Sequence, residues 1–181
     1  FNFINNNNIF YCIFIKQKKN KMKIIGIIGW KNSGKTFYAS KIIKKLKSNN
    51  YRVASIKHAH HEFDIDHQNT DSFIHRKSGS SQVIISSSKR WAKICELDGE
   101  NEKKLDELIS ELSEVDIVII EGYKNENHPK IEIIIEKENK HLFQNIKNVK
   151  ALISDIPLDS DIKQFKKNEI DKIVNYILNE I

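Results

Sequence analysis

Residues 29–36 read "GWKNSGKT" and match the pattern G-x-x-x-x-G-K-[ST] at each of its fixed positions. An apolar run, "KIIGIIG" at residues 23–29, leads into this stretch. Residues 35–47 follow it, with apolar side chains on one helical face and lysines on the other. A strand, a glycine-containing loop and a helix in this order are typical of the phosphate-binding unit of P-loop proteins. The sequence therefore predicts a nucleotide site at residues 29–36.

Each part of this loop has an expected task. Gly29 lets the chain turn sharply off the strand, and Gly34 lets the backbone approach phosphate without an intervening Cβ. Lys35 is expected to reach the β- and γ-phosphates as a catalytic residue, and the Thr36 hydroxyl to ligate Mg²⁺. The residues expected to hold the nucleotide here are Gly29, Lys31, Asn32, Ser33, Gly34, Lys35, Thr36 and Phe37.

Two later strand ends supply acidic residues. "VDIVIIEG" at residues 115–122 ends in Glu121, which we expect to bind Mg²⁺ or its water, because ligands gather beyond the carboxyl ends of parallel strands. "ALISD" at residues 151–155 ends in Asp155, whose carboxylate would accept hydrogen bonds from guanine. A simple turn residue before Ile156 and Pro157 is the alternative for Asp155.

The rest of the chain alternates between apolar strands and amphipathic helices. Strands are predicted at residues 51–57, 81–88, 91–97, 115–122 and 148–155, with a sheet-edge strand at 130–136, and helices at 105–112 and 170–178. This order predicts an α/β protein: a three-layer P-loop NTPase fold with a mostly parallel sheet.

Composition restricts the class of protein. The chain has 181 residues, of which 39% are hydrophobic and 30% charged, so one globular domain is expected. The formal charge of +6 comes from lysines distributed along the whole chain, without the aromatic–basic pattern of nucleic-acid binding. It suits a small polyanionic ligand. Two cysteines without a metal motif or a disulfide framework indicate a cytoplasmic protein.

Residues 1–21 are expected to be a disordered N-terminal extension upstream of the natural start at Met22. Their apolar run is shorter than the roughly 20 residues of a membrane span, and their basic residues follow the run rather than precede it, unlike a secretory signal. The predicted domain is therefore residues 22–181, and we expect neither a membrane nor nucleic acid among its partners.

Four stretches in order, "GWKNSGKT", "IKHAHHEFDID", "IIEGYKNENHPKIEI" and "LISDIPL", resemble the MobB family. The resemblance covers the chain from Met22 onward. It implies a GTP-binding adapter of molybdopterin-guanine dinucleotide biosynthesis, related to the metal-insertion GTPases and often dimeric, with weak hydrolysis. The implied partners are the molybdenum-cofactor guanylyltransferase and the insertion proteins. Gln68, Asn69 and Thr70 depart from the family's Pro-Gly-Lys, so this chain has no lysine at that position to contact phosphate.

The histidine-rich stretch at residues 55–66 allows three interpretations: a switch loop, a transition-metal site at His58–His61, or a solvated turn. The resemblance favours the switch loop. It implies that Asp64, Asp66 and Asp71 orient Mg²⁺ or the attacking water, and that His60 and His61 contact phosphate or a partner.

Two other functions remain as alternatives to an adapter with, at most, slow GTPase activity. One is a metal-delivery GTPase that uses the histidine cluster. The other is a small-molecule P-loop kinase, which is disfavoured because residues 136–148 contain no arginine for a lid. Hydrolysis should be slow because no arginine lies in the phosphate loop to act as a finger.

Overall fold

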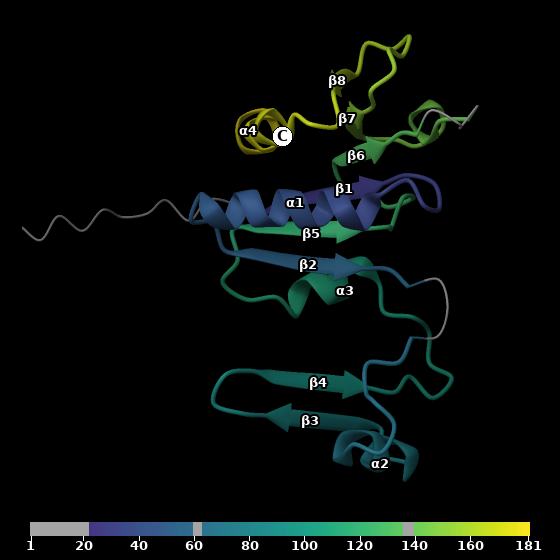
Figure 1. Cartoon of the computed structure of the whole chain (residues 1–181). Coiled ribbons are helices and arrows are strands. Elements are labelled where there is room, and N and C mark those ends of the chain that lie inside the picture. The colour runs from purple at the N-terminus through teal and green to yellow at the C-terminus, as the bar shows by residue number, and fades with distance from the viewer. Residues whose placement is uncertain (1–21, 60–62, 136–139) are drawn as a thin grey trace, which may run out of the picture.

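The computed structural model describes residues 22–59, 63–135 and 140–181 (Figure 1). Its main body is a six-stranded sheet in which each strand is parallel to its neighbours. In spatial order the strands are β2 (Val53–Lys57), β5 (Ile117–Glu121), β1 (Lys23–Ile28), β6 (Lys130–Ile133), β7 (Val149–Ile153) and β8 (Lys163–Phe165). This arrangement confirms the predicted α/β fold with a mostly parallel sheet.

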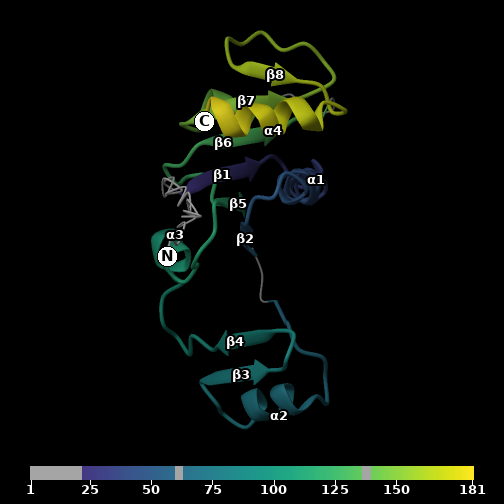
Figure 2. The ribbon, with the colours of Figure 1, turned by 90° about the vertical axis from the view of Figure 1, so that its left-hand side faces the viewer.

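Helices cover both faces of the sheet. Successive side chains of its central strands point to opposite faces, and both sets are apolar. Ile117 and Ile119 pack into one buried cluster with α1 (Lys35–Ser48) and α4 (Ile170–Asn179). Val118 and Ile120 point the other way and pack against α3 (Leu105–Ser110). Figure 2 shows α1 and α3 on opposite sides of the sheet, which gives the three predicted layers. Within the described ranges, no helix has the length and apolarity needed to cross a membrane.

The prediction of a sheet-edge strand at residues 130–136 was wrong, because β6 lies inside the sheet between β1 and β7. Its polar residues suggested an exposed face, yet Lys130 and Glu132 are both buried. The Lys130 ammonium donates to the carbonyl oxygens of Glu126, His128 (2.8 Å) and Lys147 (3.3 Å). These partners replace water around the charge and hold two loops against the start of β6.

The Glu132 carboxylate performs a similar task at the other end of β6. It accepts hydrogen bonds from the backbone amides of Leu142 and Phe143, each at 2.7 Å. These amides begin the short 3₁₀ helix η1 (Leu142–Gln144), so a buried acid holds this turn beside the sheet. Lys130 and Glu132 are therefore interior residues whose charged groups are hydrogen-bonded to the backbone.

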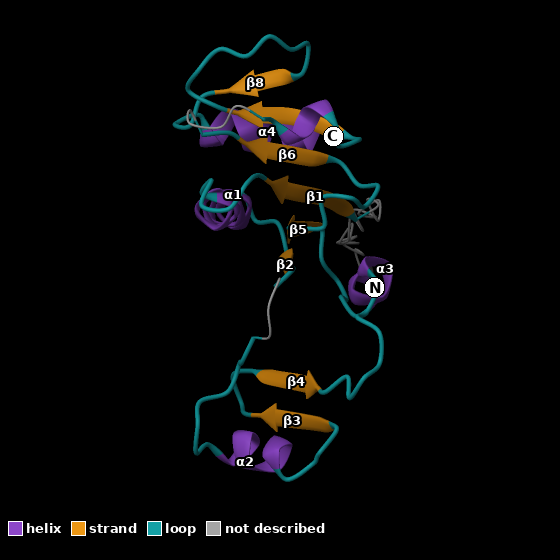
Figure 3. Ribbon diagram, turned by 90° about the vertical axis from the view of Figure 1, so that its right-hand side faces the viewer, coloured by secondary structure: helices purple, strands orange, loops and turns teal. Residues whose placement is uncertain are grey.

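A second, smaller unit lies beyond the β2 edge of the sheet, and Figure 3 shows it apart from the main body. We call it the hairpin lobe: α2 (Asp71–Lys77) with the antiparallel pair β3 (Gln82–Ser86) and β4 (Trp91–Cys95). The sequence predicted both strands, but it predicted neither α2 nor a separate sheet. Of the lobe's larger apolar side chains, Val83 is buried, whereas Ile84 and Trp91 are exposed.

Candidate functional site

The loop of residues 29–34 connects β1 to α1 at the carboxyl edge of the sheet. Gly34 has φ 91° and precedes the first residue of α1, and Asn32 is also left-handed at φ 64°. Among the described residues, no side chain caps the amino end of α1 and its first turn contains no acid. The amides at this helix end are therefore available to an anion, and the helix dipole favours negative charge there.

The interior of the loop fits a phosphate cradle. Ser33 is buried, and its hydroxyl oxygen has no hydrogen-bond partner within the part of the chain that the structure describes. A Cβ at Gly29 would lie 2.4 Å from that oxygen and 2.7 Å from the Ile133 carbonyl oxygen, so only glycine leaves this space free. A buried hydroxyl without a partner, in a space that a methyl group would fill, is suited to a phosphate oxygen.

Lys35 lies over this cradle. Its ammonium donates to the carbonyl oxygens of Gly29, at 3.1 Å, and Trp30, at 2.7 Å. Burial lowers the pKa of Lys35, the Glu121 carboxylate acts to raise it, and the Lys57 ammonium acts to lower it further. Loop carbonyls thus hold the Lys35 ammonium against the loop, where a phosphate-binding charge is expected from the sequence.

Thr36 and Glu121 meet although 85 residues separate them in the chain. The Thr36 hydroxyl lies 2.8 and 3.0 Å from the two carboxylate oxygens of Glu121. A hydroxyl and a carboxylate are hard oxygen donors of the kind that Mg²⁺ prefers. The pair therefore fits the metal site expected for these two residues.

A lysine that the sequence analysis did not select completes this group. The Lys57 ammonium lies 3.4 Å from Glu121 Oε1 and 3.5 Å from the Thr36 hydroxyl oxygen. Its position follows from the sheet register, in which Lys57 and Glu121 are paired on neighbouring strands. The only sequence signal for Lys57 was its place at the end of a predicted strand, and this does not show which strand lies beside it.

The other predicted phosphate-loop residues lie on the outside of the cradle. Lys31, Asn32 and Phe37 are exposed; the Phe37 ring packs edge-on against Tyr38 at 5.3 Å. Trp30, which was not predicted to contribute, donates from its indole nitrogen to the Lys140 carbonyl oxygen at 2.7 Å. This bond ties the phosphate loop to the segment that follows β6.

Asp155 lies at the end of β7, on the same edge of the sheet as the phosphate loop. Its carboxylate accepts a hydrogen bond from the Lys167 amide at 3.1 Å and lies 3.3 Å from the Lys167 ammonium. The amide hydrogen bond, and then the ammonium, hold the pKa of Asp155 below its usual range. The residue lines a cavity of about 300 Å³ with Ser154, Pro157, Gln164, Phe165, Lys166 and Glu169. An ionised carboxylate therefore lines a cavity at the carboxyl edge of the sheet.

Asp64 and Asp66 are engaged with Arg76 rather than with Thr36 and Glu121. Arg76 Nη2 lies 2.6 Å from Asp64, Nε lies 3.0 Å from Asp66, and Nη1 lies 2.7 Å from Glu96. The network joins Asp64 and Asp66, which precede α2, to α2 and to Glu96, which directly follows β4. The Arg76 side chain at its centre is only 12% exposed. The roles predicted for Asp64 and Asp66 stay predictions, and the described contacts of both residues are within the hairpin lobe.

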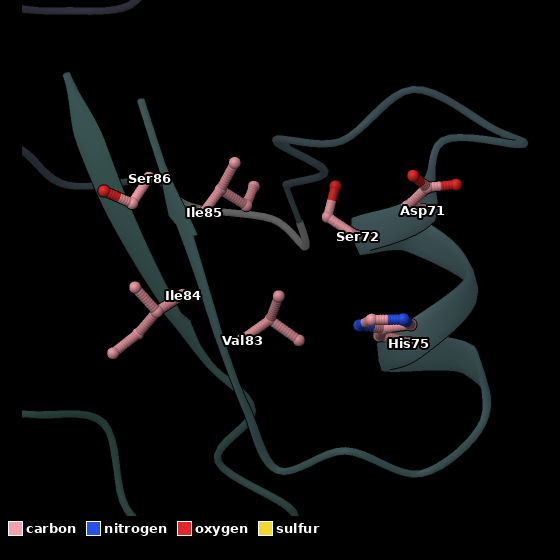
Figure 4. A pocket seen from close by; sticks show the side chains of 7 residues that line it. All are labelled: Asp71, Ser72, His75, Val83, Ile84, Ile85 and Ser86. Atoms are coloured by element: carbon pink, nitrogen blue, oxygen red, sulfur yellow. The ribbon is translucent and has the colours of Figure 1, made fainter. Parts of the chain in front are cut away.

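Asp71 is the first residue of α2 and also belongs to the hairpin lobe. It lines a cavity of about 420 Å³ between α2 and β3, and Figure 4 shows its side chain on α2. The residues that line this cavity are Asp71, Ser72, His75, Val83, Ile84, Ile85 and Ser86. Figures 1 and 2 show α2, which begins at Asp71, apart from β1 and α1, and the role predicted for Asp71 stays a prediction.

The histidine stretch is described only in part, because His60 and His61 lie outside the described residues. His58 Nε2 lies 3.0 Å from Glu102 Oε1, and its ring lies 4.7 Å from that of Tyr123. Within the described ranges, no three His, Cys, Asp or Glu residues are grouped closely enough to hold a metal ion.

Comparisons with known proteins point to one family. The family model described as Molybdopterin guanine dinucleotide synthesis protein B, MobB, matches residues 24–155. Two curated relatives are molybdopterin-guanine dinucleotide biosynthesis adapter proteins. The one from Escherichia coli (strain K12) is 30% identical over 165 residues, which is 88% of this chain and 94% of the relative. The one from Haemophilus influenzae is 34% identical over 173 residues, 94% of each chain.

Solved structures have the same fold. A MobB protein homolog from Bacillus stearothermophilus aligns with a TM-score of 0.69 at 22% identity, covering 88% of this chain and 97% of the other. A molybdopterin-guanine biosynthesis protein B aligns with a TM-score of 0.68 at 28% identity, covering 86% and 96%. The overall fold of this chain is therefore shared with these solved structures.

Proposed function

Because the chain belongs to the MobB family, we propose that it acts as an adapter protein in molybdopterin-guanine dinucleotide biosynthesis. The observation that carries the proposal is the extent of the family match. Residues 24–155 include the phosphate loop, the Thr36–Glu121 pair and Asp155, which together form the candidate site. The alternatives of a metal-delivery GTPase and a small-molecule kinase are not favoured.

We propose GTP with Mg²⁺ as the ligand of this site. The amides of residues 31–36 and Lys35 would hold the phosphates, and the buried Ser33 hydroxyl is suited to one of their oxygens. Thr36 and Glu121 would hold Mg²⁺, which supplies charge neutralisation at the phosphates. Asp155 would accept hydrogen bonds from the guanine edge. The ionised carboxylate of Asp155, which lines a cavity of about 300 Å³, supports this assignment.

Hydrolysis is proposed to be slow. The described cations near the Thr36–Glu121 pair are lysines, Lys35 and Lys57, and the Arg76 guanidinium is engaged with three carboxylates in the hairpin lobe. An arginine finger accounts for a large part of the rate in fast GTPases. His60, His61, Asp64, Asp66 and Asp71 are proposed to act in the switch segment.

The proposed partners are the molybdenum-cofactor guanylyltransferase and the insertion proteins, with the adapter working as a homodimer in the cytoplasm. The hairpin lobe supports self-association, because it carries large apolar side chains on its surface. Ile84 is 66% exposed and Trp91 is 70% exposed. Surface exposure of this kind is typical of an interface.

A binding and stimulation experiment tests the function. We expect the wild-type chain to bind GTP in preference to ATP and to raise the output of the guanylyltransferase. Lys35→Ala should lose most nucleotide affinity, whereas Lys44→Ala, an exposed lysine of the same helix, should not. Undiminished GTP affinity in Lys35→Ala would contradict the site, and equal affinity for GTP and ATP would contradict the role of Asp155.

A further inference from the structure

Lys57 contacts both residues expected to bind Mg²⁺. Its ammonium lies 3.4 Å from the Glu121 carboxylate and 3.5 Å from the Thr36 hydroxyl oxygen. These two oxygen donors are themselves within 2.8 Å of each other. A positive charge of this chain therefore lies beside the donors that a metal ion would use.

The fold fixes this position. Lys57 and Glu121 are register partners on the parallel strands β2 and β5, so both side chains leave the sheet on one face. That face is the one covered by α1, because Val53 and Ile119, earlier on the same two strands, pack in the α1 cluster. Thr36 is the second residue of α1. The contact is therefore a consequence of strand register and helix placement.

Lys57 and Lys35 place their positive charges at different parts of the site. Lys35 donates to the carbonyl oxygens of Gly29 and Trp30, on the phosphate side of the loop. Lys57 is the lysine that contacts Thr36 and Glu121. The Glu121 side chain is only 15% exposed, so its charge is costly without a nearby cation.

We propose that Lys57 acts as a built-in substitute for Mg²⁺ and exchanges with the ion. In the nucleotide-free protein its ammonium neutralises Glu121, and it would leave that carboxylate free to hold the ion when Mg²⁺–nucleotide binds. This inference rests on the proposed nucleotide and Mg²⁺ site. Lys57 is thereby a positioning residue that sets how strongly nucleotide binding depends on Mg²⁺.

The contacts of Lys57 are suited to exchange. Its side chain is 61% exposed, and its distances to both oxygens are longer than those of a close ion pair. Mg²⁺ carries twice the charge and coordinates oxygen at about 2.1 Å, so it competes successfully for the same donors. The displaced ammonium has a flexible four-carbon stem and can move into solvent.

The experiment measures GTP affinity by calorimetry in EDTA and at a series of Mg²⁺ concentrations. The proteins are the wild type, Lys57→Met and the control Lys41→Met, which removes an exposed lysine that lies over the Phe37 ring. A non-hydrolysable GTP analogue serves as a second ligand. Circular dichroism checks folding, and Lys57→Gln repeats the test if Lys57→Met does not fold.

Lys57→Met should weaken binding in EDTA by about fivefold, the scale of one partly exposed ion pair, while affinity at saturating Mg²⁺ changes little. The Mg²⁺ concentration for half-maximal effect should fall by a similar factor, because the competing charge is gone. The control should behave as the wild type.

Two outcomes would overturn this inference and leave the proposed function in place. In the first, Lys57→Met loses affinity equally with and without Mg²⁺, which means that Lys57 contacts the nucleotide in both states. In the second, its Mg²⁺ dependence matches that of the wild type. A wild-type chain without measurable GTP binding would instead overturn the proposed function, and this inference with it. A wild type that binds GTP without any Mg²⁺ dependence would remove the metal site and contradict the exchange.

Discussion

The main sheet and the hairpin lobe contain similar apolar residues but bury them very differently. Ile119 in β5 is 1% exposed, whereas Ile84 in β3 is 66% exposed. Strand β5 has neighbouring strands on both sides and helices over both faces. Strand β3 has one neighbour, and Figure 4 shows Val83 turned toward α2 and Ile84 turned away from it. Burial is therefore set by the number of covering layers and not by the residue type.

This difference indicates how each region is held together. The main sheet is stabilised by apolar area removed from water on both faces. The hairpin lobe has only a partial apolar interior, and the charged network of Arg76 with Asp64, Asp66 and Glu96 ties its parts together. An apolar outer face on a weakly buried unit is suited to a partner chain, which agrees with the proposed dimer.

The same substitution in both regions gives the largest expected effect. Ile119→Ala should lower the free energy of unfolding by about 2–5 kcal/mol, because it leaves a cavity in a closely packed core. Ile84→Ala, matched in chemistry, should change it by less than about 0.5 kcal/mol, since its side chain is mostly exposed. Urea unfolding of both variants at low protein concentration measures the difference. Equal losses would break the comparison.

Acid should weaken the main sheet through His128, which is buried beside Gly26. Burial, and then the Lys130 ammonium, lower the pKa of His128 to about 4. The unfolded chain takes up this proton below about pH 6.5, so the free energy of unfolding falls as pH drops from 6.5 to 4. At 1.36 kcal/mol per pKa unit the loss reaches about 3 kcal/mol.

Denaturant unfolding at several pH values measures this slope. His128→Leu should remove most of it between pH 6.5 and 4, whereas His67→Leu, an exposed histidine of the segment before α2, should keep it. Only the difference between each variant and the wild type is used, because carboxylates also titrate near pH 4. If the free energy of unfolding of His128→Leu depends on pH as steeply as that of the wild type, other groups cause the acid sensitivity.

The main sheet was the region that the sequence predicted best. Continuous apolar runs at residues 23–29 and 115–122 identify two buried strands from the local pattern alone. The 3.6-residue period of apolar side chains at residues 35–47 identifies a helix in the same way. β6 was misplaced because Lys130 and Glu132 look like surface residues, and their backbone partners come from distant segments. The separation of the hairpin lobe also left no local signal.

The candidate site divides in the same way. The phosphate loop was predicted from eight consecutive residues, because every position of its pattern is adjacent in the chain. Glu121 was predicted because it ends an apolar strand. Lys57 was not, since its contact with Glu121 depends on which strand lies beside β5 and in which register. Contacts that depend on sheet order can be predicted only once the fold is known, whereas contacts between residues adjacent in the sequence can be predicted without it.

Removing the central cation of the lobe should give a smaller and local loss. Arg76→Gln leaves three carboxylates without their shared charged partner, so the parts of the lobe that the network joins should open locally more often. We expect faster hydrogen exchange at the amides of β3 and β4, with β1 and β5 unchanged. Arg90→Gln, an exposed arginine of the same hairpin, is the control. Faster exchange throughout the main sheet would contradict the independence of the two regions.

The outer face of the lobe should contribute least to the stability of one chain and most to association. Trp91→Ser removes a side chain that is 70% exposed, so the free energy of unfolding should change by less than about 0.5 kcal/mol. Lys89→Ser, on the exposed turn of the same hairpin, is the matched control. Sedimentation equilibrium of both variants measures the dimer. Large aromatic side chains are frequent interface hot spots, so Trp91→Ser should raise the dissociation constant at least tenfold, while Lys89→Ser leaves it near the wild-type value. If Trp91→Ser instead destabilises the chain and leaves association intact, the tryptophan supports the lobe itself, and the dimer must use another surface.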